Sequence, residues 1–401
     1  MKGWRFLIKY AWRNLGRHPM RTFVMVLGLA FGTGYIIFAL NLARSGSSEV
    51  VADFLTQYFG HHQIVHPRYY PEANKKLFDQ AWTIDDTLSA PIDRATHTRR
   101  VTLPVFVSGP LKTLGTLLSG LEVQQELKLS RVAQGVKQGR FLDPQGTREI
   151  VIGERMARKI GVKVGDEVAL IGSGLDGSVA NDMFTVVGLL SFGGGDMEDL
   201  LAFTTLAEAQ TFASVPAGRF HQLVGFDMNH DAPAAPTGTA VMTWQRIVPE
   251  ISAAVEFIDR FTWIVSAILV LVISLGLANT LMITFMEREK EFQSLNVIGA
   301  RSSWIATALV WEIVFLATLG VATGVALGWG VTLWFNHNPI NIMVFTGGKP
   351  IMMGGIAIIP RVRLWMDPAH AWQAALLVVG FLGTGMAWPL WQVIKRSQRA
   401  H

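Results

Sequence analysis

The sequence predicts an α-helical membrane protein with four transmembrane helices and a large mixed α+β domain outside the cytoplasm. Half of the 401 residues are hydrophobic and only 16% are charged, whereas a soluble domain carries about 25% charged residues. Four stretches are apolar enough to cross a bilayer core, which takes roughly 20 residues of helix. The first two stretches are separated by a long segment in which short apolar runs alternate with polar turns.

Residues 1–20 are predicted to form an amphipathic helix in the cytoplasmic membrane interface. Its apolar side chains can gather on one side, with basic residues around the rest. These apolar residues are Trp4, Phe6, Leu7, Trp12 and Leu15. A basic amphipathic helix of this kind is attracted to anionic lipid. Pro19 breaks the helix before the first span and therefore disfavours the alternative, a cytoplasmic extension of that span.

The four predicted spans occupy residues 21–43, 258–286, 302–335 and 371–394, and a short tail follows at 395–401. Basic residues concentrate before the first span, in the tail and in the segment 287–301. Because cytoplasmic loops carry an excess of Lys and Arg, both termini and the segment 287–301 are predicted to lie in the cytoplasm. The net charge of +5 gathers at the two ends and does not indicate nucleic acid binding.

Residues 44–257 are predicted to form an extracytoplasmic domain and stalk, large enough to bury a core of its own. Strands are expected at 101–107, 149–153 and 183–190, and a helix at 154–160. The helical periodicity of 247–257 runs on into the second span and indicates a stalk. Residues 336–370 are predicted to form a shorter extracytoplasmic loop containing a hairpin.

Small residues recur at helical spacing in two of the spans. They are Gly28 and Gly32 in the first span and Gly320, Gly324 and Gly328 in the third. Glycines at this spacing let helices approach closely in lipid. The pattern fits packing within this chain and contact with a second membrane-protein chain equally well.

Glu312 is the one charged residue within the third span. An intramembrane carboxylate is costly and usually has a partner or a wet environment. We favour a structural role near the cytoplasmic interface, paired with Arg13, Arg17 or Arg21, over contact with a proton or a substrate.

The sequence offers no catalytic or metal-binding constellation. His61, His62 and His66 cluster after the first span, but neighbouring strand residues point to opposite faces, so no metal site is predicted. No Ser/His/Asp set or carboxylate pair suggests hydrolysis, and no Gly-x-x-x-x-Gly-Lys-[Ser/Thr] loop is present. The chain is therefore expected to be non-catalytic and to bind no cofactor of its own.

Four ordered motifs give the whole chain a family resemblance. They are Ala11–Leu15 with Arg17, Pro19 and Arg21-Thr22; Glu149–Gly153 with Gly161–Asp166 and Phe184–Gly188; Met286–Phe292 with Leu295 and Gly299-Ala300; and Glu312 followed by Gly320, Gly324 and Gly328. With these motifs the chain resembles the FtsX-like permeases of MacB-type ABC transporters. The resemblance implies that residues 44–257 contain a MacB-type periplasmic core.

Further residues are similar to the lipoprotein-releasing (LolC/LolE-like) branch of this family. They are Gly60, Gln63-Ile64, Thr243-Trp244, Pro249 and Asn279. The end of the chain, Pro389–Arg399, departs from the usual family ending, which leaves the role of the tail and the exact branch open. The resemblance implies a multi-pass protein of the bacterial inner membrane with its large domain in the periplasm. It also implies two copies of a separate ABC ATPase, which bind ATP and Mg, and a second permease chain, identical or homologous.

The segment 287–301 is the predicted coupling helix for that ATPase. Phe292, Leu295 and Ile298 would supply apolar anchors in a groove of the ATPase, and Glu287, Arg288 and Glu291 would make charge contacts before the turn at Gly299. The simpler alternative is a solvated turn between two spans.

Two functions fit this organisation. In the first, ATP hydrolysis on the partner drives the permease to extract a hydrophobic substrate, foremost a lipoprotein, from the outer leaflet of the inner membrane. In the alternative, mechanotransmission, the permease carries ATPase motion across the membrane to a periplasmic partner such as a hydrolase, and no substrate is transported.

Overall fold

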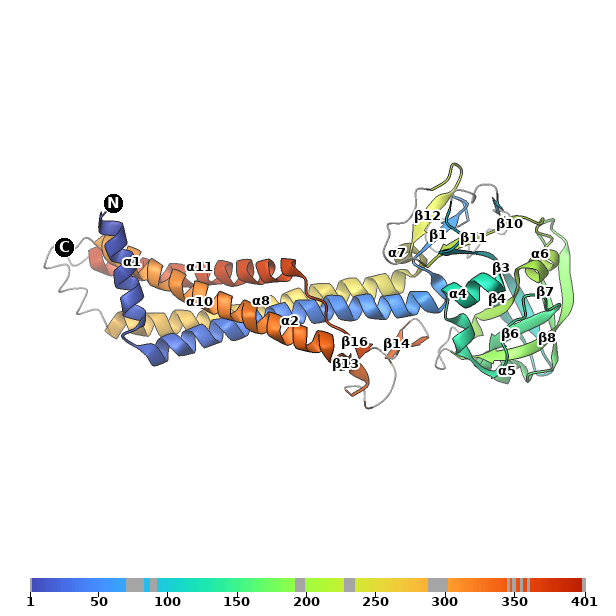
Figure 1. The fold of residues 1–401 in the computed structure, drawn as a ribbon, viewed down its shortest axis with the longest axis horizontal. Coiled ribbons are helices and arrows are strands. Elements are labelled where there is room, and N and C mark those ends of the chain that lie inside the picture. Colours follow the sequence, from blue (N-terminus) through green and yellow to red (C-terminus); the bar gives the residue numbers. More distant parts are fainter. Residues whose placement is uncertain are drawn as a thin grey trace. The chain divides into compact units, whose positions relative to one another are not determined.

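The computed structural model describes residues 2–69, 83–86, 92–191, 199–226, 235–287, 302–344, 347, 351–353, 356–358 and 361–398. The chain divides into two compact units (Figure 1). The helical unit contains residues 1–47, 256–340 and 361–401, and the external unit contains residues 48–255 and 341–360.

Five helices make up most of the helical unit. They are α1 (Lys2–Leu15), α2 (Pro19–Phe54), α8 (Pro249–Glu287), α10 (Ser302–His337) and α11 (Pro368–Gln398), of which α2 and α8 each extend into the residue range of the external unit. Among the described residues, three helical stretches are long and apolar enough to cross a membrane: Pro19–Phe59, Pro249–Thr280 and Thr307–His337. The predicted fourth span coincides with α11, but the count of four spans stays a prediction.

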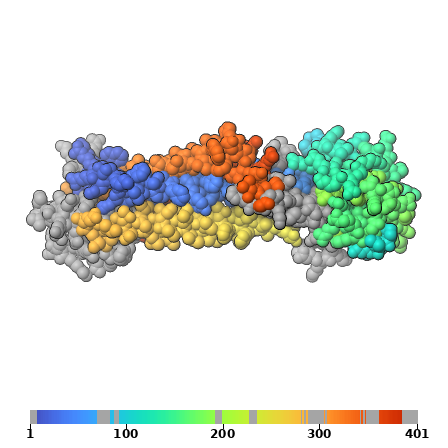
Figure 2. Space-filling view, turned by 90° about the horizontal axis from the view of Figure 1, so that it is seen from below, coloured from blue at the N-terminus to red at the C-terminus, as the bar shows by residue number. Residues whose placement is uncertain are grey.

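Buried aliphatic side chains from α1, α2, α8, α10 and α11 form one core in this unit. Leu29, Ile36 and Ile37 of α2 meet Leu316 of α10 and Val378 of α11 there. Figure 2 shows α2 and α8 side by side along one face of the molecule. Large apolar side chains also remain exposed on both of these helices, as expected of helices that face lipid.

The external unit is built on a ten-stranded sheet with the order β12-β1-β11-β3-β4-β9-β6-β8-β5, to which β7 adds by pairing with β3 and β8. Its strands are β1 (His62–Val65), β3 (His97–Ser108), β4 (Thr113–Leu121), β5 (Val136–Gly139), β6 (Glu149–Gly153), β7 (Glu167–Ser173), β8 (Val179–Leu190), β9 (Leu201–Thr205), β11 (Gln222–Gly225) and β12 (Ala240–Thr243).

Short elements complete the structure. The helices are the π-helix η1 (Leu55–Phe59), α4 (Val123–Leu129), the 3-10 helix η2 (Val132–Gly135), α5 (Glu154–Ile160), α6 (Leu206–Phe212), α7 (Trp244–Ile247) and η4 (Ile342–Val344). The remaining strands are β2 (Ile84–Asp85), β10 (Arg219–Phe220), β13 (Ile340–Asn341), β14 (Ile351–Met353), β15 (Ile356–Ile358) and β16 (Arg361–Val362). Strands β14 and β15 pair antiparallel within the predicted hairpin region.

Local sequence signals locate several elements closely. Strand β6 and helix α5 have the predicted bounds, and α5 ends at Gly161, whose φ of 81° is a left-handed cap that favours glycine. Strands β3 and β8 contain the predicted stretches 101–107 and 183–190 and extend beyond them. The glycine-rich stretch Gly193–Gly195 and most of the Ala/Pro-rich stretch 232–236 lie outside the described residues.

Two hydrophobic cores fill the external unit. One gathers side chains from β3, β6, β7 and β8 with helices α5 and α6, including Leu103, Ile152 and Phe184. The other packs the end of α2 and η1 against the sheet, through Phe54, Leu55 and Phe203, and also takes Ile251 from the start of α8. The second core therefore joins both long helices to the sheet on which they begin or end.

Candidate functional site

The ends of α2 and α8 in the external unit lead into neighbouring strands of one sheet. Helix α2 continues through η1 into β1, and β12 leads through α7 into α8. Strands β1 and β12 pair antiparallel, with His62 opposite Thr243 and Val65 opposite Ala240. The amide of Trp244 also donates to the carbonyl of His61 at 3.1 Å. The two helices are thus tied together through one hydrogen-bonded strand pair.

A buried ion pair lies beside this strand pair and fastens η1 to the sheet. Arg100 of β3 donates from Nε to Glu126 Oε1 at 2.6 Å and from Nη2 to Oε2 at 3.0 Å. Its Nη1 donates to the carbonyl of Tyr58 in η1 at 2.6 Å, and the guanidinium carbon lies 4.2 Å from the centroid of the Tyr58 ring. The side chains of Arg100 and Glu126 are 1% and 0% exposed. Three elements, η1, β3 and α4, therefore meet on one guanidinium group.

The sequence analysis did not identify this ion pair, which we call the Arg100 clamp. Its partners lie far apart along the chain, so no local spacing predicts it. The sequence contained one signal for a buried arginine: Arg100 directly precedes the apolar run 101–107, which is predicted to be a strand. An arginine inside a buried strand almost always has a partner.

From the sequence, the histidines after the first long helix were considered as a cluster. In the structure, one of them instead pairs with a histidine of β3. His62 Nε2 lies 2.9 Å from Nε2 of His97, a residue that the sequence analysis did not consider, and both rings are buried. Gly225 lies against these rings, where a Cβ atom would collide with them. Within the described residues, no group of three or more His, Cys, Asp or Glu side chains is placed to hold a metal ion.

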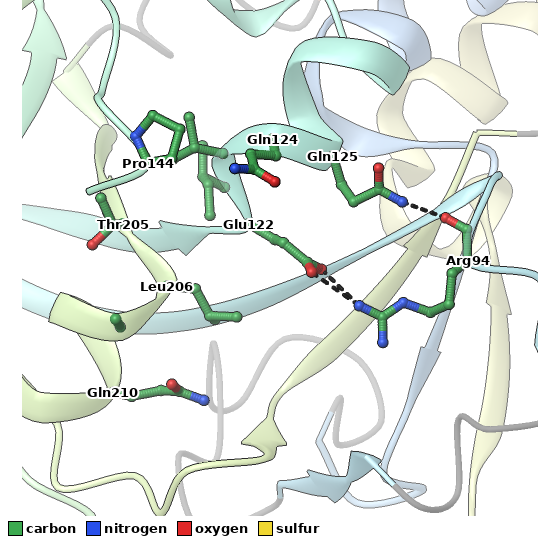
Figure 3. Close-up of a pocket in the computed structure, with 11 residues that line it drawn as sticks. Arg94, Glu122, Gln124, Gln125, Pro144, Thr205, Leu206 and Gln210 are labelled. Atoms are coloured by element: carbon green, nitrogen blue, oxygen red, sulfur yellow. Dashed lines mark hydrogen bonds and ion pairs between the residues drawn. The ribbon is translucent and has the colours of Figure 1, made fainter. Parts of the chain in front are cut away.

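A polar cleft of about 590 Å³ opens elsewhere on the external unit (Figure 3). Arg94 Nη2 donates to Glu122 Oε1 at 2.9 Å, and Gln125 Nε2 donates to the carbonyl of Arg94. Glu122 also accepts from Arg99 Nη2 at 2.8 Å. Burial disfavours the charged Glu122, but the bonds and charges of Arg99 and Arg94 outweigh burial and lower the pKa of Glu122 below its ordinary value. The charged side chains at this cleft therefore largely neutralise one another.

The membrane-embedded carboxylate of the helical unit has an amide as its hydrogen-bond donor. Asn14 Nδ2 donates to Glu312 Oε2 at 2.8 Å, and both residues are buried. Trp12 packs edge to face on Phe315, with ring centroids 5.2 Å apart. Glu312 therefore helps to hold α1 against α10.

The glycines of the third span contact α2 of the same chain. A Cβ atom on Gly324 would lie 2.5 Å from Thr33 Cβ and 2.7 Å from the carbonyl oxygen of Ala30. A Cβ atom on Gly328 would lie 3.0 Å from the carbonyl oxygen of Gly34, and one on Gly320 would lie 2.4 Å from Leu29 Cβ. Gly32 packs against Ile273 of α8, whereas a Cβ atom on Gly28 would meet nothing within 4 Å. The stripe on α10 is thus used for packing within the chain, and the position of Gly28 is open.

Of the predicted coupling residues, only Glu287 lies within the described part of the chain. It accepts hydrogen bonds from Arg21 Nη1 at 3.1 Å and Nη2 at 2.9 Å. Arg288, Glu291, Phe292, Leu295, Ile298 and Gly299 lie outside the described residues. Arg21 therefore pairs with the first residue of the predicted coupling helix, at the end of α8.

The domain matches and the relatives found by comparison with known proteins agree on one family. The MacB-like periplasmic core domain matches residues 22–235, and the FtsX-like permease C-terminal domain matches residues 263–398. The lipoprotein-releasing system transmembrane protein LolE of Haemophilus influenzae is 20% identical over 377 residues, which cover 87% of each chain. LolC of Neisseria meningitidis is 23% identical over 286 residues, covering 63% of this chain and 68% of LolC.

A solved structure, the periplasmic region of MacB from Actinobacillus actinomycetemcomitans, aligns with 51% of this chain and 97% of its own length, at 12% identity and a TM-score of 0.34. The two domain matches together span most of the sequence, in the order that the sequence motifs indicated. The chain therefore belongs to the FtsX-like permeases that carry a MacB-like periplasmic core domain.

Proposed function

We propose that this chain is the permease subunit of an ABC transporter that extracts a hydrophobic substrate, a lipoprotein, from the outer leaflet of the inner membrane. The observation that carries the proposal is the FtsX-like permease match over residues 263–398, in a sequence without a phosphate-binding loop. Its relatives LolC and LolE are named as parts of lipoprotein-releasing systems.

In this proposal a separate ATPase subunit, present in two copies, binds ATP and Mg and supplies the energy. A second permease chain, identical or homologous, completes the membrane part. Both termini and the segment 287–301 lie in the cytoplasm, and residues 287–301 receive the motion of the ATPase. The Arg21–Glu287 ion pair supports this assignment, because it connects the start of that segment to the beginning of α2.

The long helices supply a physical route for the motion. Helix α8 is 39 residues long, or about 58 Å at 1.5 Å per residue, which is roughly twice the thickness of a bilayer core. A rotation or tilt of such a helix at one end displaces its other end. There, the β1–β12 strand pair joins the chain that leaves α2 to the chain that enters α8, and the Arg100 clamp holds η1 to β3. These contacts support transmission of force into the periplasmic domain.

The test begins with the composition of the complex. The full-length chain is purified from native membranes, and its co-purifying chains and any lipidated protein are identified by mass spectrometry. An ABC ATPase together with lipidated protein is the expected result. An ATPase with a tightly bound periplasmic hydrolase and no lipidated protein would instead support mechanotransmission, and the absence of any ATPase would refute both functions.

The coupling step is tested with a matched pair of charge reversals on α8. Glu287→Arg places a like charge beside Arg21 at one end of the helix. Glu256→Arg is the control, because Glu256 is equally exposed, pairs with Arg260 on the same helix and lies toward the other end. We expect Glu287→Arg to reduce ATPase co-purification and stimulation of ATP hydrolysis by at least about tenfold and the control to leave both unchanged. Equal behaviour of the two variants would contradict the coupling assignment.

A further inference from the structure

A cavity of about 540 Å³ lies in the helical unit where the turn between α1 and α2 meets the end of α8. Its polar wall comes from Arg17, His18 and Arg21 on one side and from Glu287 on the other. Neither domain match assigns a ligand to it. We propose that this cavity binds the phosphate group of an anionic membrane phospholipid.

The charges around the cavity favour an anion. Arg17 and Arg21 carry two positive charges. Among the described residues that line the cavity, Glu287 is the one carboxylate, and it pairs with Arg21 at 2.9 Å. One of the two guanidinium charges is therefore left without compensation by the wall, and a phosphate group can accept hydrogen bonds from it.

The first turn of α2 reinforces this preference. The turn contains no acidic residue, although the amino-terminal end of a helix carries a partial positive charge that favours anions. Arginines at this end of a helix repel that partial charge unless an anion lies close to them. The cavity supplies the space for such an anion.

The surroundings of the cavity distinguish a lipid from a free ion. Met20 and Phe23 of α2 are 73% and 59% exposed, and Ile283 and Met286 of α8 are about half exposed. Met20 and Ile283 form part of the cavity wall itself. A polar cavity that continues into exposed apolar side chains on two membrane helices matches a molecule with a phosphate head and hydrocarbon chains.

The bound phosphate would compete with Glu287 for Arg21. Both groups accept paired hydrogen bonds from a guanidinium group. Because Glu287 begins the segment proposed to receive ATPase motion, lipid occupancy would alter how firmly that segment is held to α2. This consequence rests on the proposed function, whereas lipid binding itself does not.

The experiment measures lipid retention by the purified full-length chain in detergent, with native mass spectrometry. Phosphatidylglycerol is compared with phosphatidylcholine of the same acyl chains and with inorganic phosphate. We expect retention of phosphatidylglycerol over phosphatidylcholine. The double variant Arg17→Gln/Arg21→Gln should lose about thirtyfold in affinity, since each basic residue near an anionic lipid contributes roughly fivefold.

Two further variants keep the result interpretable. Arg131→Gln is the control, because Arg131 is an arginine in an ion pair with Asp53 of the external unit, and the variant should bind lipid like the native chain. The single variant Arg17→Gln keeps the Arg21–Glu287 pair intact and should also weaken lipid binding. It replaces the double variant in the test if the double variant misfolds.

Three outcomes would overturn the proposal. They are equal retention of the two lipids, unchanged binding by the arginine variants, and binding of inorganic phosphate as tight as that of phosphatidylglycerol, which would indicate a site for a free anion. ATPase co-purification is measured on the same samples. A chain that loses the lipid but keeps the ATPase, or the reverse, separates failure of this proposal from failure of the proposed function.

Discussion

Breaking the Arg100 clamp from one side should destabilise the external unit strongly. Arg100→Met leaves the carboxylate of Glu126, which is 0% exposed, without its bidentate partner and the carbonyl of Tyr58 without its donor. Removal of one partner from a buried ion pair costs about 3–5 kcal/mol. For a domain of this size, each kcal/mol lowers the melting temperature by about 2–4 °C, so the loss corresponds to roughly 6–20 °C.

The double variant Arg100→Met/Glu126→Met gives the opposite expectation. With both charges replaced by apolar side chains of similar length, no buried charge is left unpaired, and stability should return to within about 1–2 kcal/mol of the native chain. Because the clamp also holds η1, the double variant is expected to be folded but impaired in transmitting ATPase motion.

The assay is pulse proteolysis of the full-length chain in detergent at increasing urea concentration, with fragments of the external unit followed on gels. The native chain, both single variants and the double variant form a double-mutant cycle. If Arg100→Met lowers the free energy of unfolding by less than about 1 kcal/mol, Arg100 and Glu126 do not form a buried ion pair.

Three further predictions concern other contacts. Gly324→Val should abolish a monodisperse peak in size-exclusion chromatography, because its side chain would collide with the backbone of α2, whereas Gly28→Val should be tolerated. The pKa of Glu122 is lowered in the folded chain, so its ionisation stabilises the fold at neutral pH. This stabilisation should fade as the pH falls below about 4.5. In pulse proteolysis with pepsin, the stability of Glu122→Gln should therefore depend less on pH than that of the native chain. Glu312→Leu should leave Asn14 without its acceptor and lower the stability of the helical unit by about 1–3 kcal/mol, measured by thermal unfolding in detergent, whereas an unchanged melting temperature would contradict the structural role of Glu312.

Elements with strong local signals could be predicted from the sequence. The long apolar stretches locate α2, α8 and α10, since their composition alone distinguishes them from the rest of the chain. The end of α5 follows from a glycine that can adopt the left-handed conformation. The continuation of α2 to Phe54, beyond the predicted span end at residue 43, was harder to predict, because Arg44 and the serines after it resemble a loop.

Contacts between distant parts of the sequence account for what could not be predicted. The Arg100 clamp and the His62–His97 pair join strands and helices whose adjacency is set by the order of strands in the sheet. The partner of Glu312 shows the same limit. The sequence suggested an arginine near the cytoplasmic interface, and the structure gives Asn14 as a hydrogen-bond donor from that same stretch, while Arg21 pairs with Glu287.

The pairing of β1 with β12 also bears on how such a chain can change in evolution. The external unit leaves α2 and returns to α8 through two adjacent strands, so its two ends meet at one place. Inserted domains whose ends lie close together can be lengthened, shortened or replaced without altering the spacing of the host. The helical unit can therefore keep one arrangement of helices while the domain carried between residues 62 and 243 changes in sequence and size.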